Sequence, residues 1–179
     1  ELYDAVLMMW FFHLRSQDMP VLRCEMFEVK VDDDGNEEAY LKMTSAKGNR
    51  DLKISEAYRP DAANAVKRML QRRKNRGWLL FDMYSRPTNN PSQSQVGDTL
   101  NTLLQYACVK AGITKKVIWT SLRHTAFMET CREFDDLRNP SLLASFADNA
   151  YTSAKTLREN YLNKIDREST ALKGRKTLK

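Results

Sequence analysis

Apolar residues recur at helical spacing along most of this chain, and strand-like segments occupy one region in its first third. The strand-like segments are residues 24–31, 39–44 and 52–55. Residues 32–36 (Asp-Asp-Asp-Gly-Asn) have a strong turn composition, and residues 47–49 (Lys-Gly-Asn) form a second turn signal. The pattern therefore predicts a small three-stranded antiparallel sheet.

The remaining apolar segments predict helices. Residues 1–14 are apolar nearly all round, which is typical of a buried helix. Residues 16–23 predict a short helix broken near Pro20, because proline is tolerated only in a first turn. Cap signals and helical spacing predict further helices at residues 60–76, 99–110, 121–134, 141–149 and 153–165.

Two segments lack a clear helical or strand pattern. Residues 78–84 are apolar but ambiguous, and residues 85–96 have the Ser, Pro, Asn and Gln content of a loop. The order is helices, then a small sheet, then more helices. We therefore expect an α+β domain that is mostly helical.

Length and composition limit the class of protein. A chain of 179 residues with 42% apolar content suits one domain with a real core. No apolar run approaches the roughly 20 residues that a membrane span needs, and no signal peptide is visible. The three cysteines are widely spaced and odd in number, which argues against disulfides and structural zinc. We expect a cytoplasmic protein without contact to a membrane.

The net charge of +6 favours a polyanionic partner. Basic residues gather at positions 67–76 and 173–179, and either cluster alone would be interpreted as a solvated helix face or a frayed tail. Two clusters in a basic domain favour nucleic-acid binding as well, so both interpretations stay open. Because the chain begins at Glu1 inside a helical pattern, we expect it to be a fragment of a longer protein.

Two C-terminal motifs suggest chemistry. Residues 121–127 (Ser-Leu-Arg-His-Thr-Ala-Phe) put Arg123 near a predicted helix start, where N–H groups and the helix dipole favour an anion. Residues 152–161 end on Tyr161, a residue type that can attack a phosphate. Together these motifs resemble the C-terminal motifs of the tyrosine recombinase (phage integrase) family.

The resemblance covers nearly the whole chain. Residues 14–22 resemble the family's first arginine box, with Arg15 and Asp18 at a spacing that lets the carboxylate orient the guanidinium. Residues 46–50 resemble its β-hairpin segment, in which Lys47 would reach DNA. Each box alone has an ordinary interpretation, a surface ion pair or a polar turn. Four boxes in the family's order identify the chain as resembling a tyrosine recombinase catalytic domain.

Two positions depart from the family pattern. Thr120 stands where a histidine often precedes the second arginine, and Thr152 stands where a histidine or tryptophan often precedes the tyrosine. The attacking tyrosine therefore lacks its usual helper in proton transfer. His124 follows the arginine in many members and is more often structural than catalytic. His13 lies in a strongly apolar segment and is expected to be a packed core residue.

The resemblance implies a mechanism without metal or cofactor. Arg15 and Arg123 would grip one DNA phosphate, with hydrogen bonds from Thr120 and Thr152. Tyr161 would attack the phosphorus to form a 3′-phosphotyrosine link, and the leaving 5′ oxygen would be protonated by Lys47. Further DNA contacts are expected from His124, Arg50, Arg72 and Arg73.

The expected organisation is a tyrosine recombinase catalytic domain at residues 1–165 and a basic tail at residues 166–179, with an N-terminal DNA-binding domain missing. The resemblance implies double-stranded DNA as partner, a tetramer on DNA, accessory DNA-bending proteins, and a bacterial or phage-encoded protein at the nucleoid. One alternative is a catalytically weakened DNA-binding or accessory module derived from a recombinase. A type IB topoisomerase, which shares the chemistry, is the third hypothesis.

Overall fold

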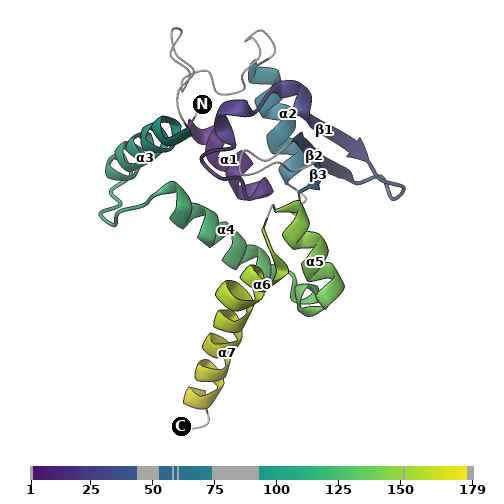
Figure 1. The fold of residues 1–179 in the computed structure, drawn as a ribbon, viewed down its shortest axis with the longest axis vertical. Helices are drawn as coiled ribbons and strands as arrows, with labels where there is room; N and C mark the ends of the chain where they lie inside the picture. The colour runs from purple at the N-terminus through teal and green to yellow at the C-terminus, as the bar shows by residue number, and fades with distance from the viewer. Residues whose placement is uncertain are drawn as a thin grey trace. The chain divides into compact units, whose positions relative to one another are not determined.

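The computed structural model describes residues 2–43, 53–57, 59, 61–73, 93–150 and 152–176. Over these residues the fold is mostly helical, with one small antiparallel sheet (Figure 1), so the predicted coarse fold class is confirmed. The chain divides into two compact units, unit 1 (Glu1–Arg123) and unit 2 (His124–Lys179). The boundary falls inside helix α4 (Trp119–Glu133), between Arg123 and His124.

The elements follow one another along the chain in a simple order. Unit 1 holds α1 (Leu2–Phe12), the 3-10 turns η1 (Met19–Val21) and η2 (Cys24–Met26), strands β1 (Phe27–Val31), β2 (Glu37–Met43) and β3 (Lys53–Glu56), helices α2 (Ala62–Arg73) and α3 (Gln93–Lys110), and the start of α4. Unit 2 holds the rest of α4, then η4 (Asp135–Arg138), α5 (Pro140–Asn149), α6 (Ala154–Leu157), the π-helix η5 (Arg158–Leu162) and α7 (Asn163–Lys176).

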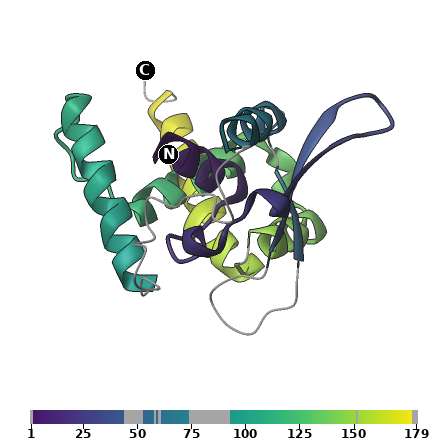
Figure 2. The ribbon, with the colours of Figure 1, turned by 90° about the horizontal axis from the view of Figure 1, so that it is seen from above.

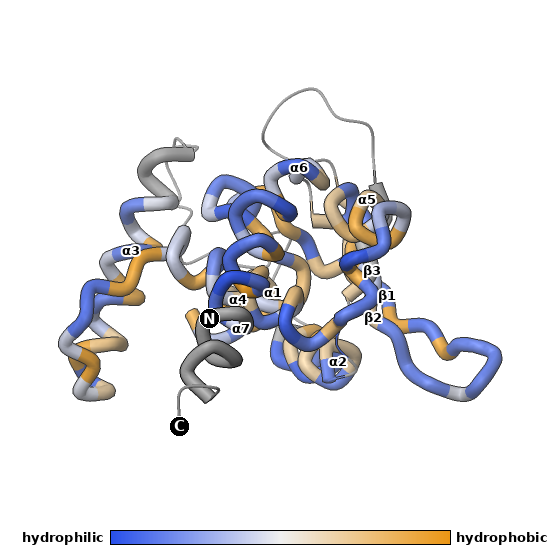
Figure 3. Tube along the Cα trace, turned by 90° about the horizontal axis from the view of Figure 1, so that it is seen from below, coloured by the Kyte–Doolittle hydropathy of each residue, from blue (hydrophilic) through white to orange (hydrophobic). Residues whose placement is uncertain are grey.

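The sheet of unit 1 has the strand order β1-β2-β3, with Phe27 opposite Leu41 in the first antiparallel pair. The predicted turn between β1 and β2 is confirmed: the Asp32 N–H donates to the Asn36 carbonyl at 2.9 Å, and Gly35 has φ +85°. This hairpin extends away from α1 and α2 (Figure 2), and its turn is hydrophilic (Figure 3). The predicted turn at residues 47–49 lies outside the described residues.

Helix α2 covers β1 and β2 with a small-residue face. Its buried residues recur at helical spacing, and alternate residues of β2 are buried as well. The buried apolar residues include Ala62, Val66 and Met69 on the helix and Ala39, Leu41 and Met43 on the strand. The helix begins two residues later than predicted, at Ala62, and its predicted last turn after residue 73 lies outside the described residues.

Helix α1 ends earlier than its apolar pattern suggested. His13 has φ +53°, the left-handed conformation that terminates helices and usually belongs to glycine. The predicted helix at residues 16–23 is wrong: only the short turn η1 forms there, and the backbone at Leu22 and Arg23 is extended. The strand predicted to start at residue 24 starts at Phe27 instead, because η2 occupies the three residues before it. Pro20 lies in the first turn of η1 and lacks the N–H that a longer helix through this position would need. His13 itself is 4% exposed, as predicted for a packed residue.

Helix α3 starts at Gln93, inside the segment predicted as a loop. Residues 93–96 (Gln-Ser-Gln-Val) are polar in composition, but glutamine costs little in a helix once neighbouring turns are formed. The prediction of a loop is therefore wrong for these residues. The preceding residues 85–92 and the ambiguous segment 78–84 lie outside the described residues.

Unit 2 confirms the predicted cap signals. The Asn139 side chain accepts from the Ser141 N–H at 2.9 Å, with Pro140 as the first helical residue of α5. The Ser153 hydroxyl accepts from the Thr156 N–H at 3.1 Å at the start of α6. The predicted end of the last helix at residue 165 is wrong, because α7 continues to Lys176.

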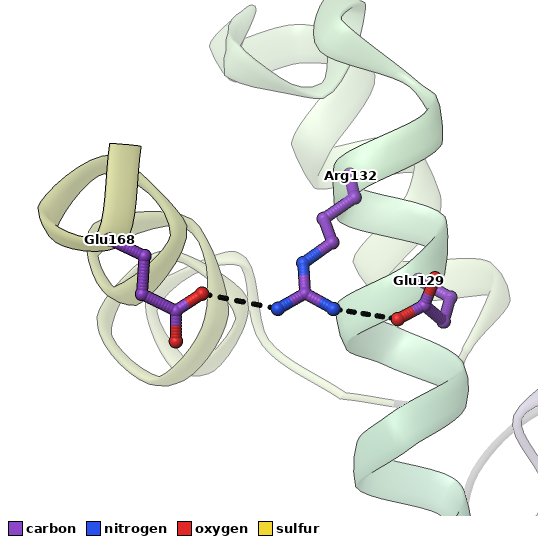
Figure 4. Close-up of polar contacts among 3 residues, drawn as sticks. All are labelled: Glu129, Arg132 and Glu168. Carbon is purple, nitrogen blue, oxygen red and sulfur yellow. Dashed lines mark hydrogen bonds and ion pairs between the residues drawn. The ribbon is translucent and has the colours of Figure 1, made fainter. Parts of the chain in front are cut away.

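Ion pairs hold α7 to the earlier part of unit 2. Arg132 of α4 donates to Glu129 at 2.7 Å and to Glu168 of α7 at 3.1 Å (Figure 4). Arg138 of η4 donates to Asp166 of α7 at 2.8 Å in the same manner. The hydrogen bonds to these carboxylates, foremost to Glu168 and Asp166, raise the pKa of both guanidinium groups. In the part of the chain that is described, no helix is long and apolar enough to cross a membrane.

Candidate active site

A cleft in unit 1 brings together two segments that are far apart in the sequence. Its volume is about 290 Å³, at the small end of protein pockets, which suits a group the size of a phosphate better than a large ligand. The lining residues are Arg15, Ser16 and Gln17 from the segment after α1, and Trp119, Thr120 and Arg123 from the start of α4. Both predicted arginines and one of the two predicted threonines therefore share one cleft.

Backbone carbonyls after α1 hold the start of α4. The left-handed conformation of His13 follows the end of α1, and the carbonyls of His13 and Leu14 accept hydrogen bonds from α4. Arg123 Nε donates to the first carbonyl at 2.5 Å, and Trp119 Nε1 donates to the second at 3.3 Å. A guanidinium anchored through Nε cannot rotate freely, so its position at the cleft is restricted.

Asp18 was expected to orient the guanidinium of Arg15, and the bonds that the structure shows between the two residues involve the Arg15 backbone. The Asp18 carboxylate accepts from the Arg15 backbone N–H at 2.9 Å, and the Asp18 N–H donates back to the Arg15 carbonyl at 3.0 Å. Asp18 is 1% exposed, and a buried carboxylate needs such partners. The acid thus fixes the backbone conformation that carries Arg15 into the cleft.

Helix α4 begins two residues earlier than predicted. Its first N–H, from Trp119, donates to Asn101 Oδ1 of α3 at 2.8 Å. The Ser121 hydroxyl accepts from the Ile118 N–H at 3.0 Å, which is the return bond of a capping box. Arg123 therefore lies in the second turn, and the expectation that it occupies the opening turn is wrong. Thr120, which is exposed, occupies that turn instead.

Tyr161 lies in unit 2 on the π-helix η5 and is 4% exposed. Its hydroxyl is hydrogen-bonded to His124 Nδ1. The tyrosine ring lies against Phe127, with ring centroids 5.1 Å apart, and the His124 ring centroid is 5.6 Å away. Because His124 and Phe127 are three residues apart on α4, one face of that helix positions the tyrosine. Single π-turns inside helices are frequent at functional sites.

The other predicted residues are placed as follows. Thr152 lies in unit 2, half-buried, with its N–H donating to the Ala147 carbonyl at 2.8 Å. Lys47 and Arg50 lie outside the described residues, and so does the side chain of Arg73.

The first basic cluster has partners within unit 1. Arg72 forms an ion pair with Asp4, a residue of α1 that is 4% exposed, and its Nε lies 3.4 Å from the second carboxylate oxygen. Lys67 forms an ion pair with Glu37 of β2. These two cations thus join α2 to its neighbours, which is a structural role that the interpretation as a DNA-binding cluster did not anticipate.

Sequence reasoning missed two contributors to these sites. Trp119 lines the cleft, and its 2% exposure together with the indole hydrogen bond makes it the anchor of α4. His124 was expected to be structural or to touch DNA, whereas it contacts the tyrosine hydroxyl. A histidine directly after the arginine was a visible signal, but only the packing of η5 on α4 reveals its partner.

The arrangement combines cations at a cleft with a separate tyrosine hydroxyl that is hydrogen-bonded to an imidazole. Two guanidinium groups and a threonine hydroxyl at one small cleft can bind the oxygens of a phosphate. A tyrosine hydroxyl hydrogen-bonded to an imidazole can lose its proton to that imidazole. Among the described residues, no group of three or more His, Cys, Asp or Glu side chains is placed to hold a metal ion.

Comparison with known proteins found no matching protein-family model, no matching curated protein and no matching solved structure. The case for a function therefore rests on the side chains and their geometry.

Proposed function

We propose that this protein is a site-specific DNA recombinase or integrase of the tyrosine recombinase type. It cleaves and rejoins double-stranded DNA through a 3′-phosphotyrosine intermediate. The observation that carries the proposal is the cleft of unit 1, where Arg15, Arg123 and Thr120 meet from distant parts of the chain. The motifs suggested these residues separately, and a shared cleft is what phosphate binding requires of them.

The arginines of the cleft stabilise the charge of the reacting phosphate. Arginine suits this task because its planar fork matches phosphate oxygens and keeps its charge at any physiological pH. The hydrogen bond from Arg123 Nε to the His13 carbonyl restrains one cation before substrate arrives, and the Asp18 carboxylate fixes the backbone that carries the other. Preorganised charge of this kind stabilises a transition state without a cost of reorganisation.

Tyr161 supplies the nucleophile. Its hydroxyl oxygen attacks the phosphorus, the bond to the 5′ oxygen breaks, and the leaving oxygen takes a proton from Lys47. The new phosphotyrosine ester keeps the energy of the broken phosphodiester, so a 5′-hydroxyl from another strand can attack it without ATP. Arg123 and His124 are consecutive residues of α4, so one helix carries a residue of the phosphate cleft and a residue that contacts the nucleophile. The substrate is double-stranded DNA, and the working assembly is a tetramer.

A second candidate is a module that binds DNA without cleaving it. The specific observation that favours it is the burial of Tyr161, which is 4% exposed and already hydrogen-bonded. The threonines at positions 120 and 152 also favour this second candidate, because neither can take a proton from tyrosine.

Covalent trapping separates the two candidates. The protein is mixed, in EDTA, with nicked duplexes tiled across the DNA that flanks its gene, and the products are run on a denaturing gel. Three proteins are compared: wild type, Tyr161→Phe, which keeps the buried ring, and Tyr106→Phe, which removes the hydroxyl of a tyrosine 63% exposed on α3.

We expect a shifted protein–DNA band with wild type and Tyr106→Phe and none with Tyr161→Phe. Binding in a native gel without any covalent band in wild type would favour the non-cleaving module. A covalent band on every duplex regardless of sequence would instead favour a topoisomerase, because recombination depends on a specific site.

A further inference from the structure

We propose that His124 receives the phenolic proton of Tyr161 during attack and returns it during rejoining. The inference rests on the proposed function, since it assigns a role in the same reaction. Thr120 and Thr152 occupy the positions where a proton-accepting side chain was expected, and neither is a base. His124 is therefore a catalytic residue at a position that the motifs did not assign to proton transfer.

The first support is the contact itself. The Tyr161 hydroxyl is hydrogen-bonded to His124 Nδ1, and both residues belong to unit 2. In the neutral imidazole with its proton on Nε2, the Nδ1 lone pair accepts the phenolic hydrogen. That tautomer places a base on the reacting oxygen before DNA binds.

The second support is the way the pair is held. Phe127 is 1% exposed, and its ring packs edge-on against Phe146, with centroids 5.9 Å apart. On its other side it contacts the ring of Tyr161. These contacts lie one turn along α4 from His124, so the tyrosine ring and the imidazole are positioned by the same helix face.

The third support is the apolar setting of the tyrosine. Tyr161 is 4% exposed and lies against the buried ring of Phe127, and an ionised phenolate in such a place is poorly solvated. Forming a free phenolate before the attack is therefore unfavourable. The proton moves only as the bond to phosphorus forms and the phenol becomes more acidic.

The step balances as follows. The Tyr161 oxygen forms a bond to phosphorus while the bond from phosphorus to the 5′ oxygen breaks. The phenolic proton passes to His124 Nδ1, which leaves an imidazolium, and the 5′ oxygen takes its proton from Lys47. In rejoining, a 5′-hydroxyl attacks phosphorus and gives its proton to the lysine amine. The Tyr161 oxygen then recovers its proton from His124.

The decisive variant is His124→Asn. The amide oxygen of asparagine takes a place close to that of Nδ1 and accepts a hydrogen bond, but it cannot take a proton. We expect the single-turnover rate of covalent adduct formation to fall by roughly 10²-fold or more, the range lost with a general base. The affinity for the same DNA in a native gel should stay within about threefold of wild type. An adduct rate equal to that of wild type would overturn the inference.

A second measurement distinguishes proton transfer from simple support of the ring. Tyr161 is replaced by 3-fluorotyrosine, whose phenol is more acidic, in both wild type and His124→Asn. If His124 takes the proton, fluorination narrows the difference in adduct rate between the two proteins, because the more acidic phenol depends less on a base. A difference that fluorination leaves unchanged would mean that His124 only supports the ring, and would contradict the proposal.

A third measurement needs no DNA. The measurement is an NMR spectrum of the imidazole nitrogens. The chain has only two histidines, His13 and His124, so the signals are simple to assign with His124→Asn as reference. We expect His124 to carry its proton on Nε2, with Nδ1 as acceptor. A proton on Nδ1 would overturn the inference even if adducts form. No adduct with any protein, alongside the expected tautomer, would instead show that the proposed function fails, and the catalytic role of His124 with it.

Discussion

The two units position their chemical groups by different means. In unit 1, the arginine and tryptophan side chains of α4 donate to backbone carbonyls of the segment after α1, and Asp18 accepts from a backbone N–H. In unit 2, the hydroxyl of Tyr161 meets a histidine side chain, and its ring meets a phenylalanine. Unit 1 thus uses main-chain groups to hold the side chains at the start of α4, whereas unit 2 uses packed side chains to hold the proposed nucleophile.

This difference has a consequence for substitutions. Arg123 donates to the backbone carbonyl of residue 13, which any residue with the left-handed conformation can present. The side chain at position 13 therefore matters less for this bond than the backbone conformation there. The environment of Tyr161 depends directly on the side chains of His124 and Phe127. Unit 2 should therefore tolerate fewer changes around its reactive group. Four experiments test the comparison.

The largest effect is expected from removing an aromatic anchor in each unit. Phe12 pairs edge-on with Phe27 in unit 1 (5.7 Å), and Phe127 pairs in the same way with Phe146 in unit 2. Replacing either Phe12 or Phe127 by alanine should cost about 3–5 kcal/mol of unfolding free energy, since both are almost fully buried. Hydrogen exchange followed by mass spectrometry should show lost protection mainly in the unit that carries the substitution. Equal loss in both units would contradict the division.

The next largest effect concerns the cleft. Arg123→Lys removes the Nε donor to the His13 carbonyl and the planar fork for phosphate. The rate of adduct formation should fall by roughly 10²–10³-fold, comparable with removing one preorganised donor from an active site. Arg23→Lys, at an exposed arginine paired with Glu25 outside the cleft, is the matched control and should act like wild type. Single-turnover assays on the trapped duplex measure both variants.

The third effect is a pH dependence of the unfolding free energy that comes from Cys131, a residue of unit 2. Burial raises the pKa of the Cys131 thiol to about 11. Because the pKa in the folded state lies above the value of 9.0 for an unburied thiol, the stabilisation of the folded state by the neutral thiol is fully present below about pH 9. That contribution, up to about 3 kcal/mol, is lost as the pH rises from 9 through 11.

Urea unfolding at pH 8, 9.5 and 11 checks this dependence, with Cys131→Ala as the reference that lacks the thiol. The difference in unfolding free energy between wild type and Cys131→Ala should shrink as the pH rises. A constant difference would contradict the raised pKa. At pH 8, native Cys131 should also react with iodoacetamide far more slowly than the half-exposed Cys24.

The smallest effect is expected from the ion pairs of α7. Glu168→Gln removes one of the two carboxylates that Arg132 contacts (Figure 4) and should cost less than about 1 kcal/mol, because the pair is half-exposed. A double-mutant cycle with Arg132→Gln isolates the coupling energy, which should decrease at 1 M salt. Glu129→Gln removes the other carboxylate within α4 and is the control for effects that do not involve α7. A coupling energy that does not respond to salt would be inconsistent with an exposed ion pair.

Much of the fold could be predicted from local patterns. The hairpin turn at residues 32–36, the caps at Asn139 and Ser153, and most helices followed from residue types whose effect acts over a few positions. The errors have the same origin. Residues 93–96 have the composition of a loop yet extend α3. The short turn η1 replaces a predicted helix around Pro20, and η2 replaces the start of a predicted strand. In these segments the packing of the surrounding unit overrides local propensity.

The candidate site was predictable in part. The motifs identified Arg15, Arg123, Thr120 and Tyr161 as candidates, but no local pattern signals that two arginines share a cleft. That arrangement includes the left-handed conformation of His13. Glycine is the residue that usually adopts this conformation, so a histidine there gives no sequence signal for it.

By itself, the sequence determined the mostly helical fold class, the position of the small sheet, and which residues are candidates for phosphate binding and attack. Only the tertiary structure decided that the His13 carbonyl anchors Arg123, that Arg72 pairs with Asp4, and that His124 contacts the Tyr161 hydroxyl. The physical reason is range. Helical spacing, turns and caps act between residues a few positions apart, whereas these three contacts join residues separated by tens of positions, and only packing of whole elements brings them together.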